Sequence, residues 1–470
     1  MTEAEQLNEF IKGPCSPLTF SPGFAASALR IEINCEELQL NDKETFESCW
    51  WNTCSDKPHH FWPFYRKPSP EYDIWMPSHF SVISMFSPSS IRDKCYYNLV
   101  KILYNDSTTN MKDFIIKRPG INLTWLGNTT QTKYTTNCGL DAVNDIGKFG
   151  GLVGKTAPYR QFVETLQFLG YTSGLTMQIL PYDFRPSILY NGHDKIFKRA
   201  VKRLNRVTGK RVIVSGHSYG NINIYYALTS MDQQEKDSTI KTFISIHPPF
   251  GSGLATAMKA LIGGSERLKV GPIGLNFWSY MSFLSQQAVI YEGIPTDVFE
   301  IDADKYWMKN ITSQIHYEEQ KGEGPTEKGL RWWPDFNQTC SRNYMYHDNC
   351  STGLFNQSAF NMMNIGQEAY KINQMRNYII KNTFNSPKLA KKSFDLIDNY
   401  EPSRAIKVDF VNPGVPVQVM FSTKIRTEFG LVYLEDPSKH KYNERLKNPD
   451  LFRLVRGDKT VTANSALIPT

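Results

Sequence analysis

Apolar positions in the middle of the chain follow two spacings, short unbroken runs and runs with helical periodicity. The short runs Gly174–Phe184, Arg211–Ser215 and Thr242–Gly251 are typical of strands buried on both faces of a parallel sheet. Between them, His193–Lys210 places its apolar side chains on one face of a helix, and Ile222–Met231 continues as a second helix. This β-α-β-α-β order predicts a mostly parallel, doubly wound sheet of the α/β class.

Outside this region the pattern predicts further strands and two irregular segments. Ser16–Phe24 predicts a short strand that ends in a glycine turn, and Pro416–Thr423 and Leu451–Val455 predict strands that return to the same sheet. Between Cys35 and Cys95 the chain is Pro-rich and aromatic-rich, and it holds four of the eight cysteines. From Ser252 to Tyr400 the pattern weakens into helices and polar loops, which predicts an insertion over the sheet.

Composition and charge narrow the class of protein. With 40% hydrophobic and 13% aromatic residues among 470, the chain can bury a large core. The net charge of +7 comes from both signs mixed along the chain without a basic run, so no nucleic-acid partner is expected. The chain has no run of eighteen apolar residues, so no membrane-spanning helix is expected.

Cysteines and glycosylation sequons point to the secretory pathway. The eight cysteines, an even number, lack the spacing of metal ligands, so no metal site is expected. With the sequons, they favour an oxidising compartment, whether extracellular, vacuolar or lysosomal. The N-terminus has no apolar stretch typical of a signal peptide, which suggests that this end is incomplete. The seven Asn-x-Ser/Thr sequons are at Asn105, Asn122, Asn128, Asn310, Asn337, Asn349 and Asn356.

Ser218 lies in the stretch Arg211–Asn221, whose sequence is RVIVSGHSYGN. A bare Gly-x-Ser-x-Gly pattern occurs by chance in roughly one chain in ten to one in five of this length, and it then marks a tight turn with a solvated serine. Here a buried strand precedes the pattern and a helix follows it, as a nucleophile elbow requires. The helix N-terminus places the backbone N–H of Tyr219 where it could stabilise a developing oxyanion. The sequence therefore predicts that Ser218 is a catalytic nucleophile.

The histidine beside this serine is not the expected base. Adjacent residues on such a turn point apart, so His217 is expected to be packed or hydrogen-bonded within the elbow. In this class of enzyme an acid follows the serine, and the histidine follows the acid. Asp458, directly after a strand and Gly457, suits an acid that orients an imidazole at the carboxyl edge of the sheet. The alternative is a turn aspartate that caps Lys459–Val461.

Four motifs in register carry a resemblance to a known family. Together they resemble the lecithin:cholesterol acyltransferase family, which includes lysosomal phospholipase A-type acyltransferases and phospholipid:diacylglycerol acyltransferases. The likeness runs from about Pro17 to the last residue and implies an α/β-hydrolase domain over residues 14–470, with a divergent insertion. The motifs are PYDFR (Pro181–Arg185), VSGHSYGN (Val214–Asn221), HPPFGSG (His247–Gly253) and GDKTV (Gly457–Val461).

The resemblance assigns roles to individual residues. Ser218 matches the nucleophile and Asp458 the triad acid. Ala25 lies in a turn that resembles the family's Pro-Gly-aromatic turn, so its backbone N–H would join that of Tyr219 in the oxyanion hole. An alanine poses no difficulty there, since the donor is the backbone. No metal or organic cofactor is implied.

Residues 36–97 resemble the family's disulfide-closed, membrane-binding subdomain. Trp75 would then face the membrane, and Cys95 would pair with Cys49 or Cys54. Apart from the family, the short, Pro-broken stretches rich in Trp and Phe also suit a bilayer interface. The alternative is a small aromatic cluster over the core.

Residues 252–400 are expected to form a cap over the sheet. At its start, Phe250–Gly264 is a small-residue segment bounded by glycines, directly after a core strand. By resemblance this segment is the mobile lid over the acyl pocket, with Gly251, Ser252 and Gly253 at its beginning. As bare sequence it could be an ordinary surface helix.

The expected base is missing from the sequence. No histidine lies between Asp458 and Thr470, and the last one, His440, precedes the acid. Three explanations compete: the sequence is truncated, the protein binds lipid without turnover, or an unusual base is used. For an unusual base, His247 is the one candidate, because it stands at the carboxyl end of a strand, but this position favours a wall of the pocket over a base.

These observations predict a serine-dependent lipid acyltransferase or phospholipase acting at a phospholipid membrane surface. The acyl donor would be a glycerophospholipid, and the acceptor a sterol, another alcohol or water. Within the family that the chain resembles, the asparagine at position 221, directly after the second glycine of the elbow, favours the lysosomal phospholipase branch. The alternative is a catalytically silent lipid-binding protein without the triad histidine.

Overall fold

The computed structural model divides into two compact units. The first contains residues 1–245, 266–289 and 413–418, and the second contains residues 246–265, 290–412 and 419–470. The structure describes residues 2–49, 54, 59–61, 64–66, 71–75, 95, 98–105, 115–125, 139–144, 159–251, 257, 259, 261–262, 269–270, 273–274, 287–294, 338–341, 350–352, 363–365, 368–370, 372–382, 387–399, 411–422, 425–433, 435–436 and 451–458.

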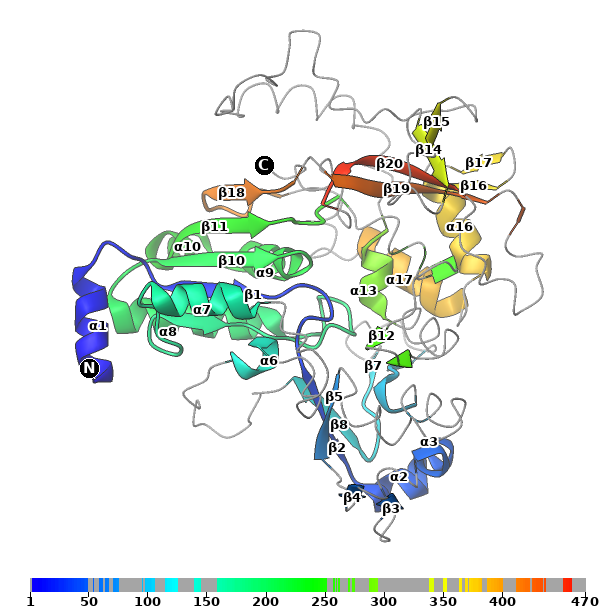
Figure 1. The fold of residues 1–470 in the computed structure, drawn as a ribbon, viewed down its shortest axis with the longest axis horizontal. Helices are drawn as coiled ribbons and strands as arrows, with labels where there is room; N and C mark the ends of the chain where they lie inside the picture. The colour runs from blue at the N-terminus through cyan, green and yellow to red at the C-terminus, as the bar shows by residue number, and fades with distance from the viewer. Residues whose placement is uncertain are drawn as a thin grey trace. The chain divides into compact units, whose positions relative to one another are not determined.

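A five-stranded sheet with the order β18-β11-β10-β1-β9 forms the core of the fold (Figure 1). Strand β1 runs parallel to both of its neighbours, with Leu18 opposite Ile213 on one side and Met177 on the other. Order and direction confirm the doubly wound α/β fold and the return of Pro416–Thr423 to this sheet. The strands are β1 (Leu18–Ser21), β9 (Met177–Ile179), β10 (Val212–His217), β11 (Ile240–Ile246) and β18 (Val417–Met420).

Helices pack on this sheet through apolar faces that the sequence pattern predicts. On α8, Phe197, Val201 and Leu204 are fully buried, while charged residues cover the rest of the helix. Helix α8 packs against α9 and against β1. Apart from α2 and α3, which are given below, the described helices of the first unit include α1 (Glu3–Lys12), α6 (Asp141–Asn144), α7 (Arg160–Phe168), α8 (His193–Thr208), α9 (Gly220–Thr229) and α10 (Gln233–Thr239).

Between β1 and β9 the chain leaves the five-stranded sheet, and the part of it in residues 29–125, here called the excursion, contains two disulfides. Cys49 pairs with Cys95, and Cys35 pairs with Cys54. The partner of Cys95, which the sequence left open, is therefore Cys49. The excursion contains α2 (Cys35–Asn41), α3 (Lys43–Cys49), a three-stranded sheet of β5 (Glu71–Trp75), β2 (Leu29–Ile33) and β8 (Ile121–Trp125), and the strand pairs β3 (His59–Phe61) with β4 (Phe64–Arg66) and β6 (Leu103–Tyr104) with β7 (Ile115–Ile116).

The second unit contains a six-stranded sheet with the order β15-β14-β20-β19-β16-β17. Beside it, α16 (Ile372–Asn382) and α17 (Pro387–Asn399) are joined by an ion pair of Arg376 and Asp398, 2.7 Å apart. The strands are β14 (Gln338–Ser341), β15 (Cys350–Thr352), β16 (Met363–Ile365), β17 (Glu368–Tyr370), β19 (Ile425–Tyr433) and β20 (Leu451–Gly457). The remaining elements of the chain are α13 (Ala288–Glu292), β12 (Lys269–Val270) and β13 (Ile273–Gly274).

The prediction that Leu451–Val455 returns to the parallel sheet is wrong. This segment begins β20, which pairs antiparallel with β14 and β19 in the second unit. The sequence holds the reason, because arginines at 453 and 456 interrupt the apolar run that a strand buried on both faces needs. The proposed boundaries at residues 36–97 and 252–400 stay predictions.

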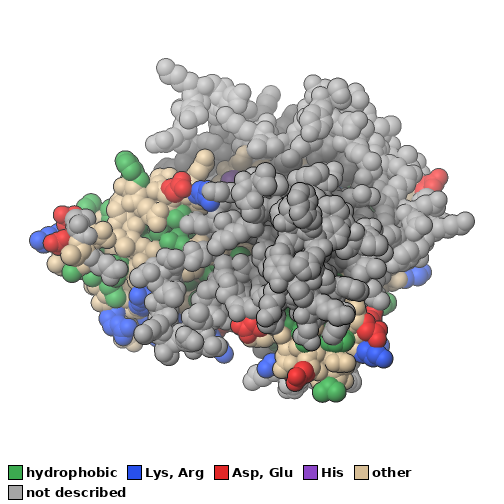
Figure 2. Space-filling view, turned by 60° about the horizontal axis from the view of Figure 1, so that its bottom comes forward, with side chains coloured by type: hydrophobic (Ala, Val, Ile, Leu, Met, Phe, Trp, Pro, Cys, Tyr) green, Lys and Arg blue, Asp and Glu red, His purple; other side chains and the backbone are tan. Residues whose placement is uncertain are grey.

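Two expectations from the composition concern the charge of the surface and the hydropathy of the helices. In Figure 2 acidic and basic side chains are interspersed over the described part of the face shown. Among the described residues, no helix combines the length and the hydropathy needed to cross a membrane.

Candidate active site

Ser218 occupies a strained turn between β10 and α9. Its φ is +50°, a left-handed conformation that costs a non-glycine residue about 1–3 kcal/mol. The turn is held by Asn221, whose backbone N–H and side-chain Nδ2 both donate to the carbonyl oxygen of Ser218, at 3.1 and 2.9 Å. Strand, strained serine and helix together form the geometry of a nucleophile elbow.

The elbow lies in direct contact with the turn that follows β1. A Cβ atom on Gly220 would meet the carbonyl oxygens of Ser21 and Pro22, so no larger residue fits at this position. A Cβ atom on Gly23 would come within 3.1 Å of the Cβ atom of Ser218. The two turns are therefore packed backbone against backbone beside the serine.

The residues predicted to donate to an oxyanion lie on these two turns. Tyr219 is the N-cap residue of α9, and its side chain is buried. Ala25 follows Gly23 by two residues and has a φ of +59°. In the described part of the chain only three non-glycine residues have positive φ, and two of them are Ala25 and Ser218. Strain of this kind concentrates where a site fixes the direction of a backbone group.

A buried tyrosine, which no sequence motif predicts, connects the two turns. The hydroxyl of Tyr159 accepts a hydrogen bond from the Gly23 N–H at 2.8 Å and lies 2.8 Å from Nδ1 of His217. Burial raises the pKa of Tyr159 to about 12, so the hydroxyl keeps its proton and can donate it to Nδ1. His217 is hydrogen-bonded within the elbow, in agreement with the expectation that it is not the base.

A buried histidine, His193, contacts the end of β1. Nε2 of His193 is 3.0 Å from Oγ of Ser21, and His193 is fully buried at the start of α8. Burial lowers the pKa of His193 to about 3, so this imidazole is neutral at physiological pH. It anchors the last residue of β1.

The PYDFR motif joins the sheet to the disulfide-closed excursion. Arg185 donates to both carboxylate oxygens of Asp183, at 2.9 and 2.6 Å, and its Nη1 donates to the carbonyl oxygen of Val100 at 3.0 Å. Val100 lies five residues after Cys95, where the disulfide closes. The described contacts of this motif are structural.

In the second unit, Asp458 lies against an imidazole. Nδ1 of His247 is 3.9 Å from Oδ2 of Asp458, and both side chains are partly exposed. His247 directly follows β11 and is the third non-glycine residue with positive φ, at +46°. Its backbone N–H donates to the carbonyl oxygen of Met420 at 2.7 Å. The imidazole that the described structure places beside the predicted acid is thus the one candidate base named from the sequence.

Several predicted site residues fall wholly or partly outside the described residues. The backbone of Trp75 pairs with Leu29 in the three-stranded sheet, but its side chain lies outside the description. Gly251 is buried, and Ser252 and Gly253 are not described. Membrane contact by Trp75 and a lid beginning at Gly251 stay predictions.

The sequence matches the model of one protein family. A family model described as lecithin:cholesterol acyltransferase matches residues 72–468. The chain is 27% identical over 212 residues to phosphatidylcholine-sterol acyltransferase of Mus musculus, which covers 44% of the chain and 42% of that protein. It is 31% identical over 118 residues to the lysosomal phospholipase A and acyltransferase of Homo sapiens, covering 24% of the chain and 28% of that protein. The chain thus spans less than half the length of these curated relatives. The chain is also similar to a solved structure, the Tle4–Tli4 complex, in an alignment that covers 97% of this chain and 89% of that one. The TM-score of 0.36 and the sequence identity of 13% are too low to carry an argument.

Proposed function

Because the chain belongs to the lecithin:cholesterol acyltransferase family, we propose that it is a serine-dependent lipid acyltransferase or phospholipase. The observation that carries the proposal is the strained Ser218, held between β10 and α9 against the glycine turn after β1. A solvated turn serine needs neither the positive φ nor the backbone contact.

The proposed chemistry is acyl transfer in two steps. Oγ of Ser218 attacks the ester carbonyl of a glycerophospholipid, and the ester bond breaks to leave a seryl acyl-enzyme and a lysolipid. Backbone N–H groups of Ala25 and Tyr219 stabilise the oxyanion of each tetrahedral intermediate. An alcohol or water then attacks the acyl-enzyme and restores Ser218.

Ser218 needs an imidazole to accept its proton, and two sources are open. The order of the triad in this fold class places the histidine downstream of Asp458. Within the given sequence, His247 is the candidate, supported by its contact with Asp458 at 3.9 Å. In either arrangement Asp458 is the acid that orients the ring.

The names of the relatives support the substrate class. One relative is a phosphatidylcholine-sterol acyltransferase and another is a lysosomal phospholipase A and acyltransferase. We therefore propose a glycerophospholipid donor, a sterol, another alcohol or water as acceptor, and a phospholipid membrane as the site of action, contacted through Trp75. The two disulfides support a compartment of the secretory pathway.

A catalytically silent lipid-binding protein is the second candidate, because His247, the one histidine beside Asp458 among the described residues, is separated from it by 3.9 Å, beyond hydrogen-bond distance. Labelling with a fluorophosphonate probe separates the two, with Ser218→Ala as the control. Labelling of the folded protein that disappears in the alanine variant supports the enzyme. A folded protein that binds phospholipid vesicles and never labels would overturn it.

A further inference from the structure

An exposed asparagine, Asn122, lies on the free edge of the three-stranded sheet in the excursion. The sheet has the order β5-β2-β8, so β8 is an edge strand among the described strands. Asn122 pairs with Glu32 of β2, and Asn122, Leu123 and Thr124 form one of the seven sequons. An exposed edge strand is a template for unwanted pairing with another chain, which proteins commonly block.

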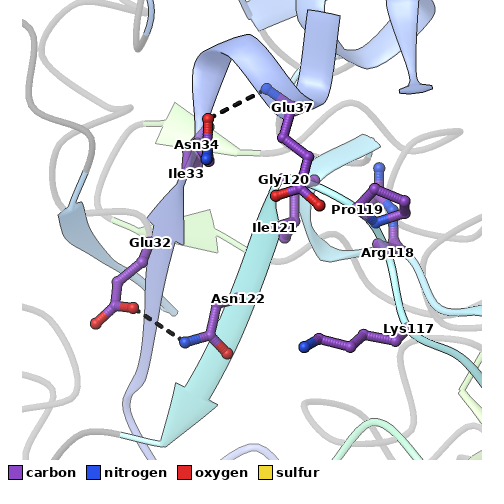
Figure 3. A pocket seen from close by; sticks show the side chains of 10 residues that line it. All are labelled: Glu32, Ile33, Asn34, Glu37, Lys117, Arg118, Pro119, Gly120, Ile121 and Asn122. Atoms are coloured by element: carbon purple, nitrogen blue, oxygen red, sulfur yellow. Dashed lines mark hydrogen bonds between the residues drawn. The ribbon is translucent and has the colours of Figure 1, made fainter. Parts of the chain in front are cut away.

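A hollow of about 530 Å³, with several charged and amide side chains in its lining, opens beside this asparagine (Figure 3). Lys117 extends toward Asn122 from the opposite side, and Asn34 and Glu37 lie at the start of α2 above them (Figure 3). Gly120 forms part of the wall, with a φ of +73° and so little room that a Cβ atom would lie 2.6 Å from the backbone nitrogen of Leu38. The hollow therefore offers hydroxyl-binding groups of both kinds, amine and amide donors with carboxylate acceptors.

We propose that Asn122 carries an N-linked glycan whose first sugar occupies this hollow. In the reaction, Nδ2 of Asn122 attacks the anomeric carbon of a lipid-diphosphate-linked oligosaccharide. The N–C bond forms, the C–O bond to the diphosphate breaks, and Nδ2 loses one of its two protons. The disulfides Cys35–Cys54 and Cys49–Cys95 flank this region, and such bonds form in the compartment where this transfer occurs.

The contact between Asn122 and Glu32 directs the sugar. Nδ2 of Asn122 donates to Oε2 of Glu32 at 3.0 Å, and this bond uses one of the two amide hydrogens. The glycosylated nitrogen keeps one hydrogen, which Glu32 can continue to hold. The bond holds the Asn122 amide beside Glu32, which is itself part of the lining of the hollow, and the glycan would cover the edge of β8. This inference is independent of the catalytic proposal.

The test begins with occupancy, in the full chain secreted from eukaryotic cells behind a cleavable signal peptide. Peptide mapping should find the glycan on Asn122, and Thr124→Val, a strand-compatible substitution, should lose one glycan-sized step in mass. Thr124→Ser keeps the sequon and should keep the glycan. Secreted protein in which the peptide of residue 122 is unmodified would overturn the proposal. Mapping needs no variant, so a folding failure of Thr124→Val leaves the test intact.

The seating of the first sugar is tested by its release under native conditions. Peptide N-glycanase should remove the Asn122 glycan several-fold faster from Glu32→Ala than from the unchanged protein. Glu36→Ala is the matched control, because Glu36 is an exposed carboxylate of the same helix region that does not line the hollow. Equal release rates from all three proteins would overturn the seating in the hollow while leaving the modification itself standing.

Discussion

The hydroxyl of Tyr159 offers a direct test of how the two turns beside Ser218 are held together. In Tyr159→Phe the ring remains and keeps its edge contact with Phe20, whose centroid is 5.0 Å away. The substitution removes one oxygen atom and, with it, the acceptor for the Gly23 N–H and the partner of His217 Nδ1. No cavity large enough to matter is created, so the effect reports the hydrogen bonds.

The expected cost follows from the two bonds. The buried Gly23 N–H is left without a partner, which costs about 1–3 kcal/mol, and the lost bond to His217 adds about 1 kcal/mol. We therefore expect the free energy of unfolding to fall by about 3 kcal/mol. The turn that carries Ala25 loses its anchor, so labelling of Ser218 should slow about tenfold, less than the hundred- to thousandfold that loss of a full oxyanion donor costs.

The assay combines urea unfolding with the rate of fluorophosphonate labelling. Tyr171→Phe is the matched control, because its hydroxyl donates to the carbonyl oxygen of Ser16 at 2.9 Å, away from the elbow. That variant should lose about 1 kcal/mol and label at the unchanged rate. If Tyr159→Phe behaved like Tyr171→Phe in both measurements, the argument that Tyr159 positions the oxyanion turn would fail.

Three further predictions concern the base, the buried histidine and a disulfide. If His247 is the base, His247→Gln and Asp458→Asn should each slow labelling by at least about a thousandfold, whereas full labelling of His247→Gln would show that His247 is not the base. Burial lowers the pKa of His193 to about 3 in the folded protein, whereas in the unfolded chain it keeps its ordinary value of about 6.5. The unfolded chain therefore binds a proton that the folded protein does not, and the free energy of unfolding should decrease as the pH is lowered from about 6.5 to about 3, by up to about 1.4 kcal/mol per pH unit. His193→Gln should remove that slope in urea unfolding at several pH values, and an unchanged slope would contradict the assignment. Replacing Cys49 and Cys95 together by serine opens a loop with a sequence separation of 46 and should cost about 4 kcal/mol, measured the same way; a loss under about 1 kcal/mol would show that the loop is already ordered without the bond.

The elbow could be predicted from sequence because its physics is local. A buried strand, two glycines and a helix within eleven residues fix the conformation of Ser218, and the structure shows that conformation. Tyr159 could not be predicted, because it lies 58 residues before His217 in the chain and nothing in its neighbourhood marks it. Long-range partners are set by packing, on which a single sequence carries little information.

The final strand shows the same limit from the other side. An apolar run predicts this strand correctly but assigns it to the wrong sheet, since short runs fit either a parallel core or an antiparallel layer. The arginines at 453 and 456 were the available signal against the core. The partner of Cys95 also depends on folding, because Cys49 and Cys54 lie at similar sequence separations from it, 46 for Cys49 and 95 − 54 = 41 for Cys54.

The backbone contact between Gly220 and the carbonyl oxygens of Ser21 and Pro22 has a consequence for how this family can vary. Two turns in such contact can only move together, so the direction of the proposed oxyanion donors would be set before any substrate arrives. Such preorganisation leaves little room for substrate-specific adjustment at the reacting carbonyl. If the proposed function holds, the choice of acyl acceptor would therefore depend on residues outside the two turns.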